Sequence, residues 1–228
     1  ISIETSEDGS CFDVIISDRT TQKKRTLSNI FLPMHGAHNV QNALSVIAIA
    51  NEMGIADSIL KKALGGFEGV KRRFTKTGEV NGISIIDDYA HHPVEIAAVI
   101  SAARAAAPNG RIISVVQPHR YSRLRDLFND FCTCFNDADV VIVAEVYSAG
   151  EEVIEGINQE TLVEGLRSHG HRHVESLRSE EVLAQLIDNI SFPGDMVVCL
   201  GAGSITNWAN ALPEELAALK SPSNQVCR

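Results

Sequence analysis

Apolar residues after position 70 form short, nearly continuous runs that alternate with stretches of helical periodicity. The runs predict a leading hairpin strand and a series of buried strands, at Phe74–Val80, Ile83–Asp87, Ile112–Val116, Val140–Ala144, His173–Leu177 and Met196–Leu200. The periodic stretches predict helices at Pro93–Ala106, Ser122–Phe135, Gln159–Ser168, Glu180–Ile190 and Ser204–Leu219. This alternation is typical of an α/β fold in which helices cover both faces of a mostly parallel sheet.

The part of the chain before residue 70 follows a different pattern. It predicts a hairpin and two helices, at Cys11–Ser17, Arg25–Leu32, Asn39–Gly54 and Asp57–Gly66. These elements form too few layers to enclose a core comfortably, so we expect them to be the last part of a larger α/β domain. Glycines that precede Lys71-Arg72-Arg73 predict a domain boundary near residue 70. Because the chain starts without Met inside strand-like sequence, we interpret it as part of a longer protein.

Composition disfavours several classes of partner. The chain is 44% hydrophobic and 21% charged, which is typical of a soluble globular protein. Its net charge of −9 disfavours binding to nucleic acid or anionic membranes, and no apolar stretch approaches the ~20 residues of a membrane span. The cysteines are odd in number and form no C-x-x-C pair, so we expect reduced thiols in a cytoplasmic protein; they are Cys11, Cys132, Cys134, Cys199 and Cys227. We interpret Cys132 and Cys134 as core residues.

Polar sequences follow three of the predicted strands, at Asp87–Pro93, Gln117–Arg123 and Glu145–Glu151. The carboxyl ends of parallel strands meet at one edge of a sheet, where ligands bind in open α/β folds. We therefore expect these three segments to lie close together and to form the functional site.

Asp87 and Asp88 are the first candidates, because a buried carboxylate is costly unless it is paired or faces a ligand. Capping of the helix that begins near Pro93 would explain one carboxylate but not both, so we favour a functional role for the pair. The neighbouring His91 and His92 invite a metal interpretation, but adjacent residues in a turn seldom chelate one ion together. We expect no metal site in this chain.

The second polar segment contains His119, Arg120 and Arg123. The two arginines are spaced i,i+3, so both guanidinium groups can face one way and bind a carboxylate or phosphate. The alternative is a surface ion-pair network with aspartates of the following helix, which we prefer for Arg125. Further along, Gly201-Ala202-Gly203-Ser204 fits either an anion-binding turn or a tight strand-to-helix connection. The chain contains no G-x-x-x-x-G-K-[ST] phosphate loop and no G-x-S-x-G nucleophile motif.

Several segments together resemble the Mur ligases of peptidoglycan synthesis. The matching sequences are His35–Ala43, Lys71–Phe74, Asp87–Pro93 and Gln117–Arg123, and the last of these resembles the alanine-adding branch of the family. The resemblance covers essentially the whole chain. It implies that residues 1–70 are the end of a central ATP-binding domain and that residues 71–228 are a Rossmann-like C-terminal domain. The phosphate loop and the Mg²⁺ ligands would then precede this chain, which would be inactive alone.

The resemblance also implies a reaction. ATP phosphorylates the lactyl carboxylate of UDP-N-acetylmuramate, and the amine of L-alanine displaces phosphate from the acyl phosphate to form an amide. Such chemistry relies on positioning and charge neutralisation.

The same resemblance implies which residues would bind each part of the substrates. The adenine of ATP would be bound by Asn39 and Asn42. The catalytic residues that meet its phosphate or ribose would be Arg73 and Asp88, with Tyr89 beside them at the nucleotide. The cleft would be lined by Tyr89, His91 and His92, and the alanine carboxylate or acyl phosphate would be held by His119, Arg120 and Arg123 with help from that histidine pair.

Two alternatives remain open. A sibling ligase that attaches a tripeptide to UDP-N-acetylmuramate during wall recycling shares the Asp-Asp-x-x-His-His-Pro sequence but not Gln-Pro-His-Arg-Tyr-Ser-Arg. The other alternative is a non-catalytic module that binds a nucleotide or anion at the Gly201 turn.

Overall fold

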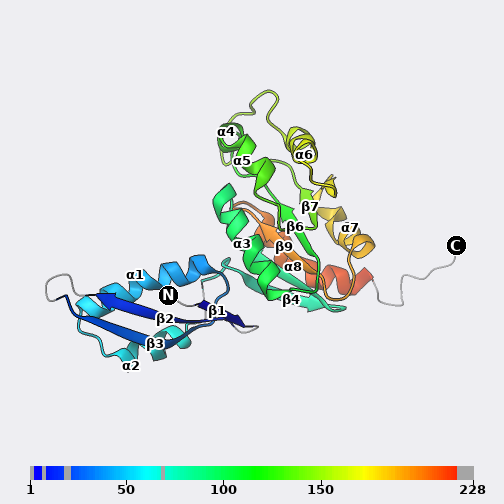
Figure 1. Ribbon diagram of the computed structural model, residues 1–228. Helices are drawn as coiled ribbons and strands as arrows, with labels where there is room; N and C mark the ends of the chain where they lie inside the picture. The colour runs from blue at the N-terminus through cyan, green and yellow to red at the C-terminus, as the bar shows by residue number, and fades with distance from the viewer. Residues whose placement is uncertain (1–2, 7–8, 18–21, 68–69, 220–228) are drawn as a thin grey trace. The chain divides into compact units, whose positions relative to one another are not determined.

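The chain folds into two compact units, Ile1–Val70 and Lys71–Arg228, each with its own hydrophobic core (Figure 1). The computed structural model describes residues 3–6, 9–17, 22–67 and 70–219. The division falls where the glycine-rich stretch ends and the three cations begin. Cys227 lies outside the described residues.

The first unit contains an antiparallel sheet with strand order β1-β2-β3. Its strands are β1 (Ile3–Ser6), β2 (Gly9–Ser17) and β3 (Lys24–Leu32). The helices α1 (Ala37–Glu52) and α2 (Asp57–Gly65) pack against β2 and β3, respectively. The sequence predicts the hairpin and both helices, and β1 lies in the strand-like sequence at the start of the chain.

The second unit contains a six-stranded sheet with strand order β4-β5-β9-β6-β7-β8. Its strands are β4 (Thr75–Val80), β5 (Ile83–Asp88), β6 (Ile112–Val116), β7 (Val140–Val143), β8 (Val174–Ser176) and β9 (Met196–Leu200). Only β4 pairs antiparallel with its neighbour, and the other pairs are parallel. The predicted mostly parallel α/β sheet is confirmed.

Helices cover both faces of this sheet (Figure 1). One face is covered by α3 (Pro93–Ala106), α4 (Tyr121–Asp126), α5 (Phe128–Thr133) and α6 (Gln159–Ser168). The other face is covered by α7 (Leu183–Ile190) and α8 (Ile205–Leu219). Every residue of β6, β7 and β9 is buried, which explains why these strands read as continuous apolar runs.

The single helix expected at Ser122–Phe135 is wrong. The segment forms two short helices, α4 and α5, separated at Leu127, where φ is −117° and ψ is 23°. Leu127 and Phe131 contact the same core, so apolar periodicity continues across the break and does not reveal it. The helix expected from Glu180 likewise begins with a 3₁₀ turn, Glu180–Val182, before α7.

Among the described cysteines, Cys11 is exposed and the other three are buried. Cys132 and Cys134 lie in the core, as expected, and burial raises the pKa of both thiols. No described helix has the length and apolar character needed to cross a membrane.

Candidate functional site

The three polar segments meet at the carboxyl ends of β5, β6 and β7. Arg120 N donates to Tyr147 O at 2.8 Å, and Tyr147 N donates to Pro118 O at 2.8 Å, which joins the second and third segments. Gly201 N donates to Asp88 O at 3.2 Å, so the glycine turn after β9 joins the first. We call this region the carboxyl edge. The convergence follows from the parallel strand pairing that the sequence predicts.

Asp88 is buried and holds the backbone on both sides of the first segment. Its Oδ1 accepts a hydrogen bond from Ala90 N at 2.7 Å, and its Oδ2 accepts one from Phe74 N at 2.7 Å. Burial raises the pKa of Asp88 from 3.8 to about 6 in spite of these hydrogen bonds. The carboxylate therefore ties the start of β4 to the end of β5.

Asp87 is also buried and faces a different set of groups. Its Oδ2 accepts a hydrogen bond from the Thr206 hydroxyl at 2.6 Å and lies 3.8 Å from Arg72 Nε, while its Oδ1 has no hydrogen-bond partner among the described residues. Burial raises the pKa of Asp87 as well. The two adjacent carboxylates thus make separate connections, one to backbone and one to α8.

Neither aspartate caps α3. The N-cap is His92, whose Nδ1 accepts from Val94 N at 3.4 Å, and the Glu95 carboxylate completes a capping box by accepting from His92 N at 3.2 Å. The capping alternative for the aspartate pair is therefore wrong. His92 has a structural task that the sequence pattern did not distinguish from substrate binding.

Arg72, which the sequence prediction passed over for Arg73, packs against the carboxyl edge. Its guanidinium donates to Gly201 O and lies 4.7 Å from the centre of the Tyr89 ring. Arg73 lies 6.0 Å from the same ring. The backbone at Arg72 is in the left-handed region, with φ 62°, which turns its side chain toward the glycine turn. A run of three consecutive cations gives no signal of which one points inward.

Four aromatic rings form a column along the carboxyl edge, and we call them the ring column. Tyr89 meets His91 edge to face at 5.1 Å, His91 lies 5.7 Å from His119, and His119 stacks on Tyr147 at 5.4 Å with 17° between the planes. These rings come from three different strand-end segments. The sequence prediction missed Tyr147, because nothing in the third polar segment distinguishes it from its neighbours.

Arg123 fixes the protonation pattern of His119. Its Nη1 donates to His119 O at 2.9 Å and contacts His119 Nδ1 at 3.3 Å. Because a guanidinium can only donate, Nδ1 accepts, and the proton of the neutral ring is on Nε2. Burial and then the nearby Arg123 lower the pKa of His119 below 6.5. The ring is therefore a neutral hydrogen-bond donor at pH 7.

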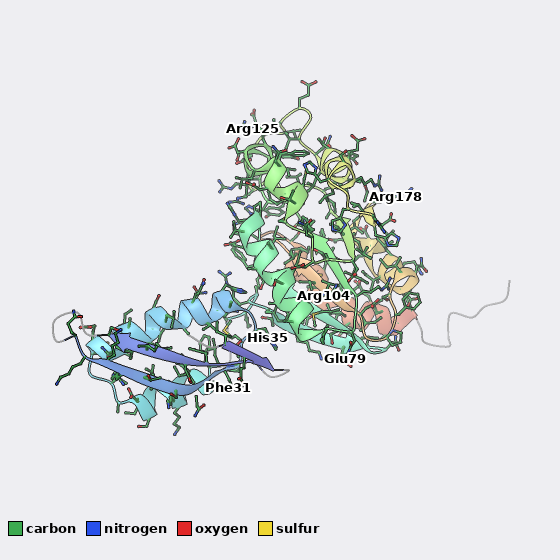
Figure 2. The ribbon with its side chains drawn as sticks, in the orientation of Figure 1. Phe31, His35, Glu79, Arg104, Arg125 and Arg178 are labelled. Carbon is green, nitrogen blue, oxygen red and sulfur yellow. The ribbon has the colours of Figure 1, made fainter. Side chains whose placement is uncertain are left out.

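Arg120 is the more accessible cation, with half of its side chain exposed (50%) and Glu151 Oε1 at 4.0 Å. Glu151 in turn accepts hydrogen bonds from Ser122 N at 2.9 Å and Ser122 Oγ at 2.6 Å, and these bonds hold its pKa below the usual value. Neither Arg120 nor Arg123 pairs with the aspartates of the following helices. The ion pair expected for Arg125 is confirmed, because Arg125 Nε donates to the adjacent Asp126 at 2.8 Å on the outside of α4 (Figure 2).

Asn39 and Asn42 lie on α1 in the first unit. Asn39 is buried and its Nδ2 donates to His35 O at 2.8 Å, whereas Asn42 is exposed. The N-cap of α1 is Gly36, so Asn39 lies within the first turn of the helix and does not cap it. Of the two amides, Asn42 is the one whose side chain is accessible to a ligand within this unit. The described residues contain no group of three or more His, Cys, Asp or Glu side chains that could hold a metal ion.

The raised pKa of Asp88 gives a testable pH dependence. The folded state retains the Asp88 proton at pH values where the unfolded state has lost it, so this residue makes the free energy of unfolding fall as pH rises from about 4 to about 6. The fall amounts to at most about 3 kcal/mol. We expect a larger fall in the wild-type chain than in Asp88→Asn, in which the buried Asp87 remains.

Urea unfolding from pH 4 to pH 8 measures this effect. The single tryptophan, Trp208, is in α8, so its fluorescence reports the second unit. Asp126→Asn is the matched control, because that carboxylate is exposed and its pKa is lowered by Arg125. A wild-type minus Asp88→Asn difference that is constant over this range, or that grows with pH, would contradict the burial of an acid with a raised pKa.

Comparisons with known proteins place the chain in a family. The family profile described as Mur ligase, glutamate ligase domain, matches residues 72–203. UDP-N-acetylmuramate--L-alanine ligase of Paramagnetospirillum magneticum is 60% identical over 215 residues, which cover 94% of this chain and 45% of that protein. The enzyme of the same name from Rhodospirillum centenum is 60% identical over 219 residues, covering 96% of this chain and 45% of that protein.

Solved structures give the same fold. The crystal structure of UDP-N-acetylmuramate-alanine ligase from Thermotoga maritima matches with a TM-score of 0.75 and 26% identity, covering 96% of this chain and 45% of that one. A murein peptide ligase from Psychrobacter arcticus matches with a TM-score of 0.61 and 24% identity, covering 99% of this chain and 45% of that one, and shares the fold. The chain spans about half the length of the curated relatives it matches. The resemblance seen in the sequence is confirmed, and the chain belongs to the Mur ligase family.

Proposed function

We propose that the chain is part of an ATP-dependent ligase that joins L-alanine to the lactyl carboxylate of UDP-N-acetylmuramate through an acyl phosphate, in peptidoglycan precursor synthesis. The observation that carries this proposal is 60% identity, over 94% of the chain, to a relative named UDP-N-acetylmuramate--L-alanine ligase. The carboxyl edge supports the proposal, because the cations Arg120 and Arg123 lie there beside the neutral donor His119, and together they could bind a small anion. We assign the ligase to the cytoplasm.

Arg120 is the residue we assign to the alanine carboxylate. Its guanidinium is half exposed and lies 4.0 Å from Glu151, so it is accessible to a ligand, and a guanidinium can grip a carboxylate with two parallel hydrogen bonds. Arg123 is partly engaged by His119, so we assign it to positioning that ring. The Nε2 proton of His119 would then donate to an oxygen of the carboxylate or the acyl phosphate. Such fixed donors stabilise charge that develops in the transition state.

The residues that we assign to the nucleotide are in helix α1, at Arg73 and at the end of β5. We propose that Asn42, with Asn39 behind it, meets the adenine, and that Arg73, Asp88 and Tyr89 meet the ribose or phosphates. The buried Asp88 would act chiefly by holding the Phe74 and Ala90 backbone in place. Mg²⁺ would neutralise phosphate charge in such a reaction, but the described residues offer no set of ligands that fits it. We therefore assign no step to a metal bound by this chain.

Of the two alternative functions, only the tripeptide-adding ligase specifies a reaction and a substrate. The murein peptide ligase from Psychrobacter arcticus is 24% identical, which supports a shared fold and not a shared substrate. The much higher identity to alanine ligases favours alanine. For the non-catalytic module, Gly201 O accepts from Arg72, and position 203 is packed against Gln117 and Tyr147, so protein groups already occupy this turn.

A full-length enzyme tests the function directly. The matching part of the Paramagnetospirillum magneticum ligase would be replaced by this sequence, and amide formation would be measured with ATP, UDP-N-acetylmuramate and a panel of amino acids and peptides. We expect L-alanine to be preferred over the tripeptide L-alanyl-γ-D-glutamyl-diaminopimelate by at least about a hundredfold in kcat/KM. The 228-residue chain alone, as control, should release no phosphate. Preference for the tripeptide, or no amide formation, would contradict the proposal.

The same enzyme tests the assigned cations. Arg120→Lys should lower kcat/KM for alanine by about tenfold, or about 1.4 kcal/mol, because an ammonium cannot make the two parallel hydrogen bonds. Arg123→Lys should lower it less, by loosening His119. Arg125→Lys is the matched control, since Arg125 is an exposed cation whose ion pair is with the adjacent Asp126. If Arg120→Lys and Arg123→Lys both match the control, the alanine carboxylate is bound elsewhere.

A further inference from the structure

A pocket of about 420 Å³ adjoins the carboxyl edge at the ends of β6, β7 and β8. Gln117 and Tyr147 line one part of it, Leu177 and Arg178 line another where β8 ends, and Trp208 of α8 contributes the indole (Figure 2 shows Arg178). Its size lies within the range of small-molecule sites, roughly 300–1,000 Å³. The cations assigned to the alanine carboxylate do not line it. The pocket is therefore beside the proposed amino-acid site and separate from it.

Tyr147 is part of both the carboxyl edge and the lining of the pocket. On one side its ring stacks on His119, with 5.4 Å between ring centres, and it also lines the pocket. Its backbone is held by hydrogen bonds to Pro118 O and from Arg120 N, both 2.8 Å long. A Cβ added at Gly203 would lie 2.6 Å from Tyr147 Cγ, so the ring packs directly against the Gly203 backbone. Tyr147 is 41% exposed and thus forms a partial wall between the His119 side of the carboxyl edge and the pocket.

The pocket can accommodate a side chain beyond this wall. Ala144, Leu177 and Trp208 give part of the lining an apolar surface, and polar and charged side chains form the rest of it, among them Glu145, Arg178, Glu180 and Glu181. The indole Nε1 of Trp208 is buried and has no hydrogen-bond partner among the described residues. The pocket therefore has space for a side chain next to its apolar part.

We propose that Tyr147 sets the upper size limit of the amino acid that the ligase accepts. This inference rests on the proposed function, in which the amino-acid carboxylate is held by Arg120 beside His119. An amino acid bound there has its side chain next to the stacked Tyr147 ring. The methyl group of alanine fits against the ring, whereas leucine or phenylalanine requires the space that the ring closes off. Exclusion of a larger side chain by a rigid wall is a repulsive source of specificity.

The test is a change of the wall in the full-length ligase described above. Tyr147→Ala joins the pocket to the amino-acid site, so the ratio of kcat/KM for L-leucine to kcat/KM for L-alanine should rise by at least about tenfold. L-phenylalanine should behave in the same way. Tyr147→Phe is the matched control, because it keeps the ring and should leave both ratios within about twofold of wild type. Thermal unfolding followed by circular dichroism checks that each variant is folded.

An unchanged ratio in folded Tyr147→Ala overturns the inference, and so does a folded Tyr147→Ala enzyme that uses no amino acid at all. If Tyr147→Ala does not fold, Tyr147→Leu decides the matter, because it removes the ring plane but keeps apolar bulk. The leucine-to-alanine ratio should then rise by about threefold, and no rise overturns the inference. The proposed function fails separately, since in that case the wild-type enzyme makes no amide with alanine.

Discussion

The burial of two adjacent carboxylates at the end of β5 is the constraint on which the candidate site depends. Asp88 accepts hydrogen bonds from the backbone of Phe74 and Ala90, and Asp87 accepts one from Thr206. Burial raises the pKa of both acids, so ionising them at neutral pH opposes folding. Burying these two acids lowers the stability of the fold, and such a cost is typical of a site that holds functional side chains in place.

A series of side-chain contacts runs from these carboxylates across the edge of the sheet. Arg72, 3.8 Å from Asp87, lies over Tyr89, and Tyr89 begins the ring column that ends at Tyr147. Each ring is attached to a rigid strand end, so neighbouring rings restrict one another without a covalent link. His119 is the member with the most defined chemistry, because Arg123 and Tyr147 fix its proton and its plane. Side chains that restrict one another in this way suit a reaction that depends on positioning.

The sequence predicts the parts of this arrangement that depend on buried strands. Short apolar runs such as Ile112–Val116 predict buried central strands, and parallel pairing then brings the polar segments that follow them together. It does not predict choices that depend on local geometry. Periodicity continues through Leu127 although the helix breaks there, and three consecutive cations do not show that Arg72 is the one turned inward.

The contacts of individual side chains are even harder to predict from the sequence pattern. His91 and His92 are adjacent and chemically identical, yet one joins the ring column and the other caps α3. Tyr147 acquires its place from a stacking partner in another loop, and no spacing along the chain encodes that contact. These contacts come from packing between segments that are distant in sequence, so a pattern along the chain does not reveal them.

The central claim is that the carboxyl edge holds His119 as a neutral ring protonated on Nε2. Nitrogen-15 NMR of the histidine side chains in the 228-residue chain measures this directly, with His119→Asn used to assign the signal. We expect Nδ1 to be unprotonated at pH 7 and the midpoint of the titration to lie below the ordinary 6.5, because burial and Arg123 both disfavour the charged ring. A ring protonated on Nδ1, or a midpoint above 6.5, would contradict the account of the site.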